Sequence, residues 1–176
     1  TASWFLKHAD NLLKVSVVPR GRSLGAAWYL PQEHVIYNTD QFMDRICTAL
    51  GGRAAEEIMF GKVSSGALDD LEKVTKQAYT MVAYYGLNEK LGNISYYDSS
   101  GQSEQSLQKP YSEATAQIID EEVHKLVEMA YERTLSLLRD HRSQLEELAQ
   151  LLLTKEVAFK DDLVAIFGER TQEVEA

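Results

Sequence analysis

The stretch SSGALDDLEKVTKQAYTMVAYYG, residues 64–86, carries the clearest helical pattern in the first half of the chain. Its apolar positions recur at spacings of three and four residues, which predicts one helix with a single buried face. Gly86 follows the pattern, and glycine commonly ends a helix in the left-handed conformation. Two adjacent acids, Asp69 and Asp70, stand in the first turn. The apolar positions are Leu68, Leu71, Thr75, Ala78, Val82 and Tyr85.

Two β-strands are predicted near the beginning of the chain. The segment LLKVSVV, residues 12–18, is rich in β-branched side chains, and LGAAWYL, residues 24–30, is closed by Pro31. Together they predict a small sheet. A further short strand is expected over residues 91–97.

Between these strands and the stretch at residues 64–86, the apolar patterns of FMDRICTAL and RAAEEIMF flank Gly51 and Gly52. They predict either a pair of helices or one helix that runs through the glycines, with Thr39 as its N-cap.

The second half of the chain has helical periodicity throughout. Ser112 is predicted to cap a long helix, and Ser143 with Glu146 fits a capping box at the start of a second helix that ends near Leu153. A third helix is predicted over residues 160–167. We therefore expect a mainly α fold with a small β-sheet. Its parts are an α and β front region (1–97), a mobile polar loop (98–109), a helical bundle (111–168) and a tail (169–176).

Composition narrows the class of protein. The chain has 176 residues, a formal net charge of -9 and 44% hydrophobic residues, which fits one soluble globular domain. The acidic balance disfavours nucleic acid as a partner, because a phosphate backbone would be repelled. No apolar run approaches the roughly 18 residues that a transmembrane helix needs. Cys47, the single cysteine, is expected to be a small core residue.

The acids at the start of the helix allow two interpretations. Carboxylates in a first turn are stabilised by the helix N-terminus, so Asp69 and Asp70 need no ligand. Alternatively Asp70, on the less polar flank of the helix, is a cation ligand. A catalytic zinc ion takes three protein ligands, so Asp70 alone cannot hold one.

Other donors in the chain do not complete a recognisable zinc motif. No two of the four histidines are spaced as in H-E-x-x-H, so each is expected to be a surface or capping residue. Glu56 and Glu57 form a rival acidic pair, but adjacent acids on a helix are usually solvated. The histidines are His8, His34, His124 and His141.

Taken in order, seven segments resemble the peptidase domain of the FtsH family of membrane-anchored, ATP-dependent AAA zinc proteases, with details closer to the bacterial than to the mitochondrial branch. The resemblance covers residues 1–170. The segments are WFLKHAD, LLKVSVVPRG, LGAAWYLP, DRICTALGGRAAEEIMFG, SSGALDDLEKVT, YYGLNEKLGNISY and KPYSEATAQIIDEEV.

The resemblance implies a zincin-like metalloendopeptidase. Asp70 matches the family's third zinc ligand, and Asp69 takes the preceding position. The family's H-E-x-x-H helix leads into the segment that matches residues 1–10, so the two zinc histidines and the general-base glutamate are expected upstream of Thr1. No catalytic residue is therefore expected within this chain, and the chain alone is expected to be inactive and to hold zinc poorly.

The strand at residues 24–30 resembles the family's strand beside the catalytic cleft. Gly25, Ala26, Ala27, Trp28 and Tyr29 are the expected substrate-binding residues, because an edge strand can pair with an extended peptide. An internal strand with Trp28 and Tyr29 in the core remains an equally weighted alternative. Asn11, where a proline is common, and residues 26–28 depart from the family pattern.

The resemblance also implies a setting for the full-length protein. That protein is expected to be a homo-hexamer at the cytoplasmic face of the bacterial inner membrane, where it degrades membrane and cytoplasmic polypeptides. ATP and magnesium would bind only through an AAA module, and membrane contact would come only through N-terminal segments, neither of which is in this chain. The alternative is a non-catalytic helical oligomerisation or interaction module derived from the same domain.

Overall fold

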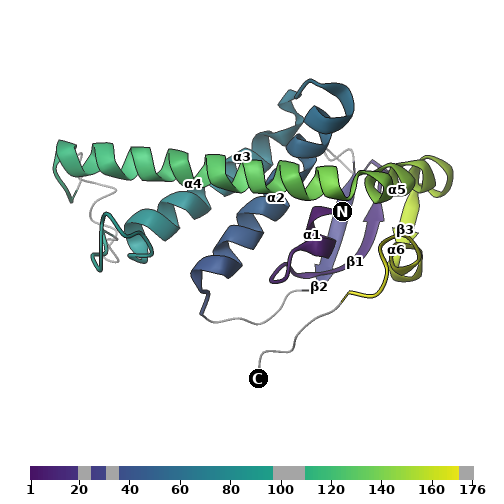
Figure 1. The fold of residues 1–176 in the computed structure, drawn as a ribbon, viewed down its shortest axis with the longest axis horizontal. Coiled ribbons are helices and arrows are strands. Elements are labelled where there is room, and N and C mark those ends of the chain that lie inside the picture. The colour runs from purple at the N-terminus through teal and green to yellow at the C-terminus, as the bar shows by residue number, and fades with distance from the viewer. Residues whose placement is uncertain (20–24, 31–35, 97–109, 171–176) are drawn as a thin grey trace.

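The computed structural model describes residues 1–19, 25–30, 36–96 and 110–170. In these ranges the chain is mainly helical with a three-stranded antiparallel sheet, which confirms the predicted fold class (Figure 1). The predicted mobile loop at 98–109, His34 and the end of the tail lie outside the described residues. The elements are α1 (Ala2–Phe5), β1 (Asn11–Ser16), β2 (Ala26–Leu30), α2 (Thr39–Phe60), η1 (Ser65–Ala67), α3 (Leu68–Tyr79), η2 (Thr80–Tyr84), α4 (Glu113–Asp140), α5 (Arg142–Lys155), β3 (Val157–Phe159) and α6 (Lys160–Phe167).

The helix predicted over residues 64–86 forms as three successive pieces, the 3-10 turn η1, the α-helix α3 and the π-helical turn η2. Ser64 begins it by accepting a hydrogen bond from the Gly66 backbone N–H at 3.1 Å. Gly86 follows with φ +63°, as predicted. Ala78 and Val82 are buried as predicted, and Val74 is buried beside them. Leu68 is 70% exposed, Tyr85 is 61% exposed and Thr75 is also exposed, so the predicted buried face was wrong at these three positions.

Helix α2 is one continuous helix through Gly51 and Gly52. Its N-cap is Asn38 rather than the predicted Thr39, because Asn38 and Gln41 exchange side-chain to backbone hydrogen bonds in a capping box. A Cβ atom on Gly51 would lie 3.1 Å from the Cβ of Ala2, so glycine lets α1 pack closely on α2.

The sheet has the strand order β2-β1-β3, so β2 is an edge strand. The two predicted strands form and pair antiparallel, with an irregularity between Leu12 and Lys14. The third strand, β3, was not predicted and comes from the C-terminal region. The strand predicted over 91–97 was wrong, since residues 91–96 contain no strand and the Tyr96 N–H instead donates to the Ala83 carbonyl at 2.8 Å.

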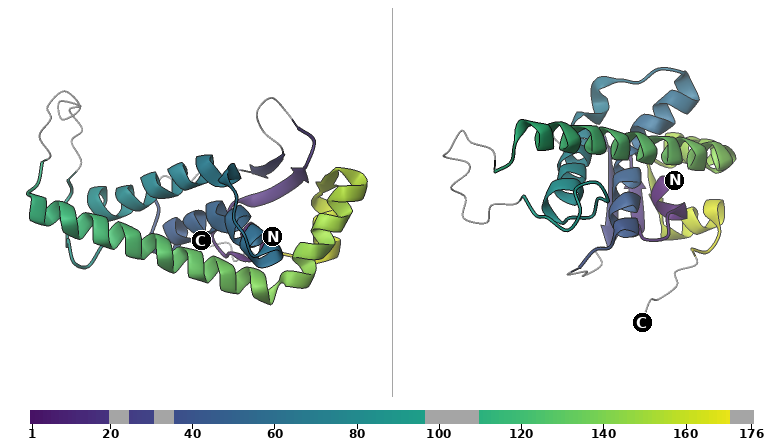
Figure 2. Two further views of the ribbon diagram at one scale, coloured as in Figure 1. Left: turned by 90° about the horizontal axis from the view of Figure 1, so that it is seen from above. Right: turned by 60° about the vertical axis from the view of Figure 1, so that its left-hand side comes forward.

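Helix α4 is the longest element and lies across α2 and α3 (Figures 1 and 2). Ser112 caps it by accepting from the Thr115 N–H, as predicted. Helices α5 and α6 also form where they were predicted. The capping box predicted at Ser143 is wrong, because α5 already begins at Arg142, and Glu146 is bonded to that arginine at 2.8 Å.

Two buried clusters lie on the two sides of α1 and the loop that follows it. The larger joins α1, α2, α3 and α4 and includes the fully buried Ile46 and Cys47, which confirms the core position of the cysteine. The smaller lies between the sheet and the helices α5 and α6, where Trp4 contacts Phe167. Because both clusters contain residues of α1 and its flanking loop, this short segment has a fixed place in the fold.

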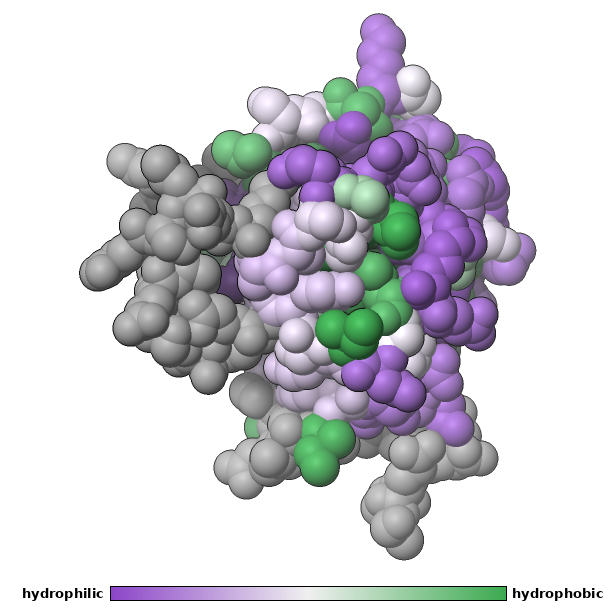
Figure 3. Space-filling model, turned by 90° about the vertical axis from the view of Figure 1, so that its left-hand side faces the viewer, coloured by the Kyte–Doolittle hydropathy of each residue, from purple (hydrophilic) through white to green (hydrophobic). Residues whose placement is uncertain are grey.

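The end of the molecule that lies to the left in Figure 1 has a mixed surface. Figure 3 shows a narrow band of hydrophobic residues there, bordered on one side by strongly polar surface. Single exposed apolar side chains are normal on soluble proteins, so this band carries no functional argument.

Candidate active-site cleft

A cleft of about 1020 Å³ separates the start of α3 from the edge strand β2. The loop before β1 and the middle of α2 complete its walls. The cleft therefore brings together the acidic turn and the strand that the sequence singled out separately. Its lining residues are Ala9, Asp10, Gly25, Ala26, Ala27, Tyr29, Arg45, Thr48, Ala49, Gly52, Gly66, Asp69, Asp70, Lys73 and Gln77.

Asp70 stands in the first turn of α3 and faces this cleft. Its side chain is 46% exposed, and its one short ionic contact among the described residues is Lys73 Nζ, 3.5 Å from Oδ1. A smaller neighbouring pocket shares Tyr29, Thr48 and Gly52 with the cleft and is also lined by residues 1–3. The first residues of the chain therefore lie beside the cleft that holds Asp70.

The donors in the cleft match a zinc site in part. Asp70 offers a carboxylate with free coordination capacity, which suits zinc as one ligand. Within the described residues, however, no group of three or more His, Cys, Asp or Glu side chains is arranged to hold a metal ion. A metal site that used Asp70 would therefore need further donors from outside the described residues.

The three described histidines lie outside the cleft lining. His8 donates its backbone N–H to Asp44, and His124 is exposed on α4. The His141 ring stacks on Phe5 with centroids 3.5 Å apart, at the N-cap of α5. Each of these positions is explained by packing or by the surface.

The rival carboxylates have structural partners. Glu56 accepts from the Ser64 N–H at 2.7 Å and from the Ser64 hydroxyl at 2.8 Å, and these bonds lower its pKa. Glu57 accepts from the Tyr131 hydroxyl at 2.6 Å and so ties α2 to α4. Neither lines the cleft, which leaves Asp70 with a better position than the rival pair.

Four of the five predicted substrate-binding residues line the cleft, one directly before β2 and three within it. These are Gly25, Ala26, Ala27 and Tyr29. Trp28 is not among the lining residues, and the Lys14 ammonium lies 4.4 Å from its ring centroid. Gly25 has a steric role, because a Cβ atom there would lie 2.7 Å from the Ser16 carbonyl oxygen of β1.

Tyr29 is the most buried of the cleft's polar groups on β2 and packs against the smaller core cluster. Burial is the main cause that raises the pKa of its phenol, and the negative charges of Asp10 and Asp70 act in the same direction. A hydrogen bond with Ser3 and the charge of Arg170 oppose the rise in pKa. The phenol therefore stays protonated at neutral pH and remains a hydrogen-bond donor.

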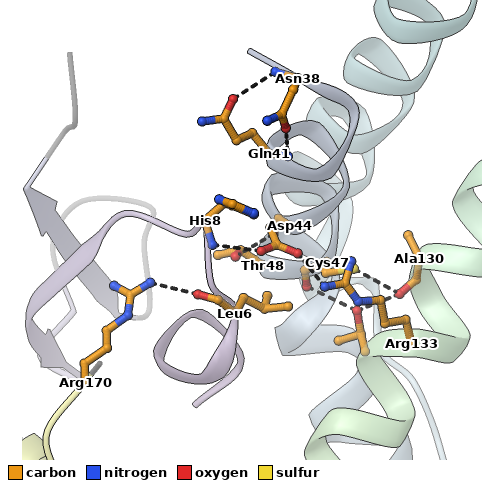
Figure 4. Close-up of polar contacts among 11 residues, drawn as sticks. Leu6, His8, Asn38, Gln41, Asp44, Cys47, Thr48, Ala130, Arg133 and Arg170 are labelled. Atoms are coloured by element: carbon orange, nitrogen blue, oxygen red, sulfur yellow. Dashed lines mark hydrogen bonds and ion pairs between the residues drawn. The ribbon is translucent and has the colours of Figure 1, made fainter. Parts of the chain in front are cut away.

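Two polar groups near the cleft were not anticipated. Gln77, two turns beyond Asp70 on α3, has a buried Oε1 atom without a hydrogen-bond partner among the described residues. Asp44 is 1% exposed and accepts both the His8 N–H at 2.9 Å and Arg133 Nη2 at 2.6 Å (Figure 4). Asp44 thereby joins the loop behind the cleft to α2 and α4.

Comparisons with known proteins agree with this architecture. The model of peptidase family M41 matches residues 1–166. The chain is 52% identical over 170 residues to the ATP-dependent zinc metalloprotease FtsH of Parabacteroides distasonis, covering 97% of this chain and 25% of that protein. It is 52% identical over 169 residues to a mitochondrial inner membrane m-AAA protease component of Mus musculus, covering 96% of this chain and 21% of that protein.

The chain thus spans about a quarter or less of the length of these relatives, and its identity to the bacterial and to the mouse protein is the same. The match to the family model over residues 1–166 shows that this chain belongs to peptidase family M41, and its relatives place it in the FtsH family of AAA zinc metalloproteases.

Proposed function

We propose that this chain is the peptidase part of an ATP-dependent zinc metalloendopeptidase that degrades membrane and cytoplasmic proteins. The observation that carries the proposal is that Asp70 and the edge strand β2 line one cleft. A metal ligand beside a strand whose outer edge pairs with no strand of the described sheet is an arrangement suited to peptide hydrolysis, since the strand orients the substrate backbone next to the metal.

Asp70 would supply one zinc ligand, and its negative charge would offset part of the charge of the ion. When bound, zinc lowers the pKa of its water to about 7 and polarises the scissile carbonyl. The weak contact between Asp70 and Lys73, at 3.5 Å, is exposed, so it costs little to replace. The remaining two ligands and the general-base glutamate would come from polypeptide outside this sequence.

Strand β2 would bind substrate through its backbone. Its inner edge pairs with β1, and its outer edge is free of strand partners in the described sheet. Main-chain pairing accepts many substrate sequences, because the hydrogen bonds do not depend on side chains. Gly25, Ala26 and Ala27 have little or no side chain that would obstruct a peptide beside this strand, and Tyr29 lines the same cleft.

The full-length protein is proposed to act as a homo-hexamer at the cytoplasmic face of a bacterial inner membrane, with ATP and magnesium bound by a separate AAA module. Among the described helices, none is both long and apolar enough to cross a membrane. The proposal assigns membrane contact to N-terminal segments of the full-length protein.

The paired variants Asp70→Asn and Asp69→Asn of the full-length protein test the ligand assignment, because the two acids are neighbours on one helix turn. We expect Asp70→Asn to lose bound zinc and to reduce peptide hydrolysis by more than about a hundredfold, beyond the 10–100-fold cost of changing an outer-shell partner. Asp69→Asn should retain both. Zinc analysis and hydrolysis of a fluorogenic peptide provide the readouts, and equal losses in both variants would contradict the assignment.

The isolated chain is a second test. We expect it to bind zinc below stoichiometric amounts and to leave casein uncleaved, because one ligand position cannot form a catalytic site. Stoichiometric zinc with casein cleavage would show that the chain is active alone.

The alternative is a non-catalytic helical oligomerisation or interaction module derived from the same domain. The absence of a three-donor metal site among the described residues is compatible with both functions. The alternative predicts a full-length protein that assembles but does not cleave peptides at any zinc concentration. Size-exclusion chromatography beside the peptide assay separates the two functions.

A further inference from the structure

The loop that joins α1 to β1, residues 6–11, is held from two sides by side chains that are distant in the sequence. On one side Asp44 of α2 accepts the His8 N–H. On the other side Arg170, which follows α6, donates to the loop (Figure 4). The loop between α1 and β1 is thus held by one residue from each half of the chain.

The Arg170 guanidinium uses both terminal nitrogens twice. Nη1 donates to the Asp10 carbonyl at 3.1 Å and to Asn11 Oδ1 at 3.0 Å. Nη2 donates to the Leu6 carbonyl at 2.8 Å and to the Ala9 carbonyl. Three of the four acceptors are backbone carbonyls, so these bonds specify the path of the loop rather than the identity of its side chains.

Only arginine can make this set of contacts. Its planar fork presents donors in fixed directions, whereas the ammonium of lysine is a compact charge with three donors on a flexible stem. Burial lowers the pKa of the Arg170 guanidinium, while the charges of Asp10 and Asp44 oppose that shift. The group stays charged, and charge-assisted hydrogen bonds are the stronger kind.

The loop that Arg170 holds is a wall of the cleft. Ala9 and Asp10 line the cleft together with Asp70 and β2. Asn11, the last residue of this loop and the first of β1, and the following Leu12 pair with Leu30 and Tyr29 of β2. A shift of the loop would therefore move a wall of the cleft and the register of the strand that closes it.

We propose that Arg170 is a positioning residue for peptide binding, because it fixes the wall formed by Ala9 and Asp10 relative to β2 and Asp70. This inference rests on the proposed peptidase function of the same cleft. Arg170 lies beyond residue 166, where the match to the family model ends. Residues 168–170, which follow α6 directly, thereby gain a role in the cleft.

The test compares Arg170→Lys and Arg170→Gln with Arg142→Lys and Arg142→Gln in the full-length protein. Arg142 is a matched control, because its side chain is 55% exposed. Among the described residues its one ion pair is with Glu146. The assay is hydrolysis of a fluorogenic peptide well below the unfolding temperature. Hydrogen exchange of the amides of residues 6–11 is measured on the same proteins.

We expect both Arg170 variants to raise KM at least fivefold and to exchange the loop amides faster, with Arg170→Gln the more severe. Both Arg142 variants should match the wild type. A role in stability alone would lower the folded fraction and hence the maximal rate, but would leave KM unchanged. Unchanged KM in both Arg170 variants, beside an active wild type, therefore overturns the inference. A wild type that binds zinc but never hydrolyses peptide overturns the proposed function instead, and the inference falls with it.

Discussion

The cleft wall at residues 6–11 is held by Asp44 and Arg170, whereas the wall at the start of α3 carries Asp70 on an exposed turn. Asp44 is 1% exposed and has two partners within 2.9 Å. The Asp70 side chain is 46% exposed, and Lys73 approaches it only to 3.5 Å. The two carboxylates therefore differ in their capacity to bind a further partner. Asp44 is committed to holding the fold, and Asp70 retains the capacity to bind an incoming cation.

The largest expected effect comes from breaking the fixed wall. Arg133→Met leaves the buried Asp44 carboxylate without its cationic partner, so we expect a loss of about 3 kcal/mol in the free energy of unfolding. Arg142→Met removes an exposed pair and should cost no more than about 0.5 kcal/mol. Urea denaturation measures both. Equal losses in the free energy of unfolding would show that the pair of Asp44 and Arg133 contributes no more to stability than an exposed ion pair.

Two glycine-to-alanine substitutions, one beside β2 and one in α2, are expected to change stability in opposite directions. Gly25→Ala places a Cβ atom 2.7 Å from the Ser16 carbonyl, and we expect a loss of about 1–3 kcal/mol from the strain. Gly52→Ala meets no atom within 4 Å and should stabilise α2 by about 0.5–1 kcal/mol. Thermal unfolding measures the direction of the stability change in both variants. If the two variants shift the midpoint in the same direction, the close approach of β1 to Gly25 is not what requires glycine.

A substitution at Gln77 tests how the α3 wall of the cleft contributes to stability. Gln77→Leu replaces a side chain whose buried Oε1 atom has no partner among the described residues with an apolar group of similar size, and should raise the free energy of unfolding by about 1 kcal/mol. Gln117→Leu on the exposed face of α4 serves as the control and should give no gain. A destabilised Gln77→Leu protein would mean that the amide is satisfied in solution.

The smallest expected effect lies at high pH, away from both walls. Burial, together with the hydrogen bond to Glu57, raises the pKa of Tyr131 to about 12. The unfolded chain loses this proton near pH 10, so the folded state holds more protons between pH 10 and 12 and stability falls as pH rises through that window. We expect Tyr131→Phe to reduce the loss of stability between pH 10 and 12. Denaturation series at pH 9 and pH 11 test it, and an unchanged slope would contradict it.

Local patterns were sufficient to predict the long elements. The periodicity of residues 64–86 placed α3, and the cap at Ser112 placed the start of α4, because both signals are contained within a few turns. The strand β3 could not be predicted, since three residues have no period of their own and become a strand only by pairing with β1. Leu68 is exposed because it lies about 120° around the helix from Val74, away from the buried face.

The cleft was predictable only in part. The resemblance to a known family pointed to Asp70 and to β2, and the structure places them in one cleft. The sequence carried no clear signal for Asp44, because its neighbours one turn away on the helix include the polar residues Asp40, Gln41 and Thr48. Nothing local could identify Arg133, 89 residues away, as its partner. The same holds for Arg170, whose acceptors lie about 160 residues upstream.

The most direct test of Asp70 as a zinc ligand is a crystal structure of the full-length protein's peptidase region with data collected at the zinc absorption edge. We predict an anomalous peak in the cleft, with an Asp70 carboxylate oxygen at about 2.0–2.2 Å from the metal. A fully occupied zinc peak whose ligands exclude Asp70 would contradict the assignment.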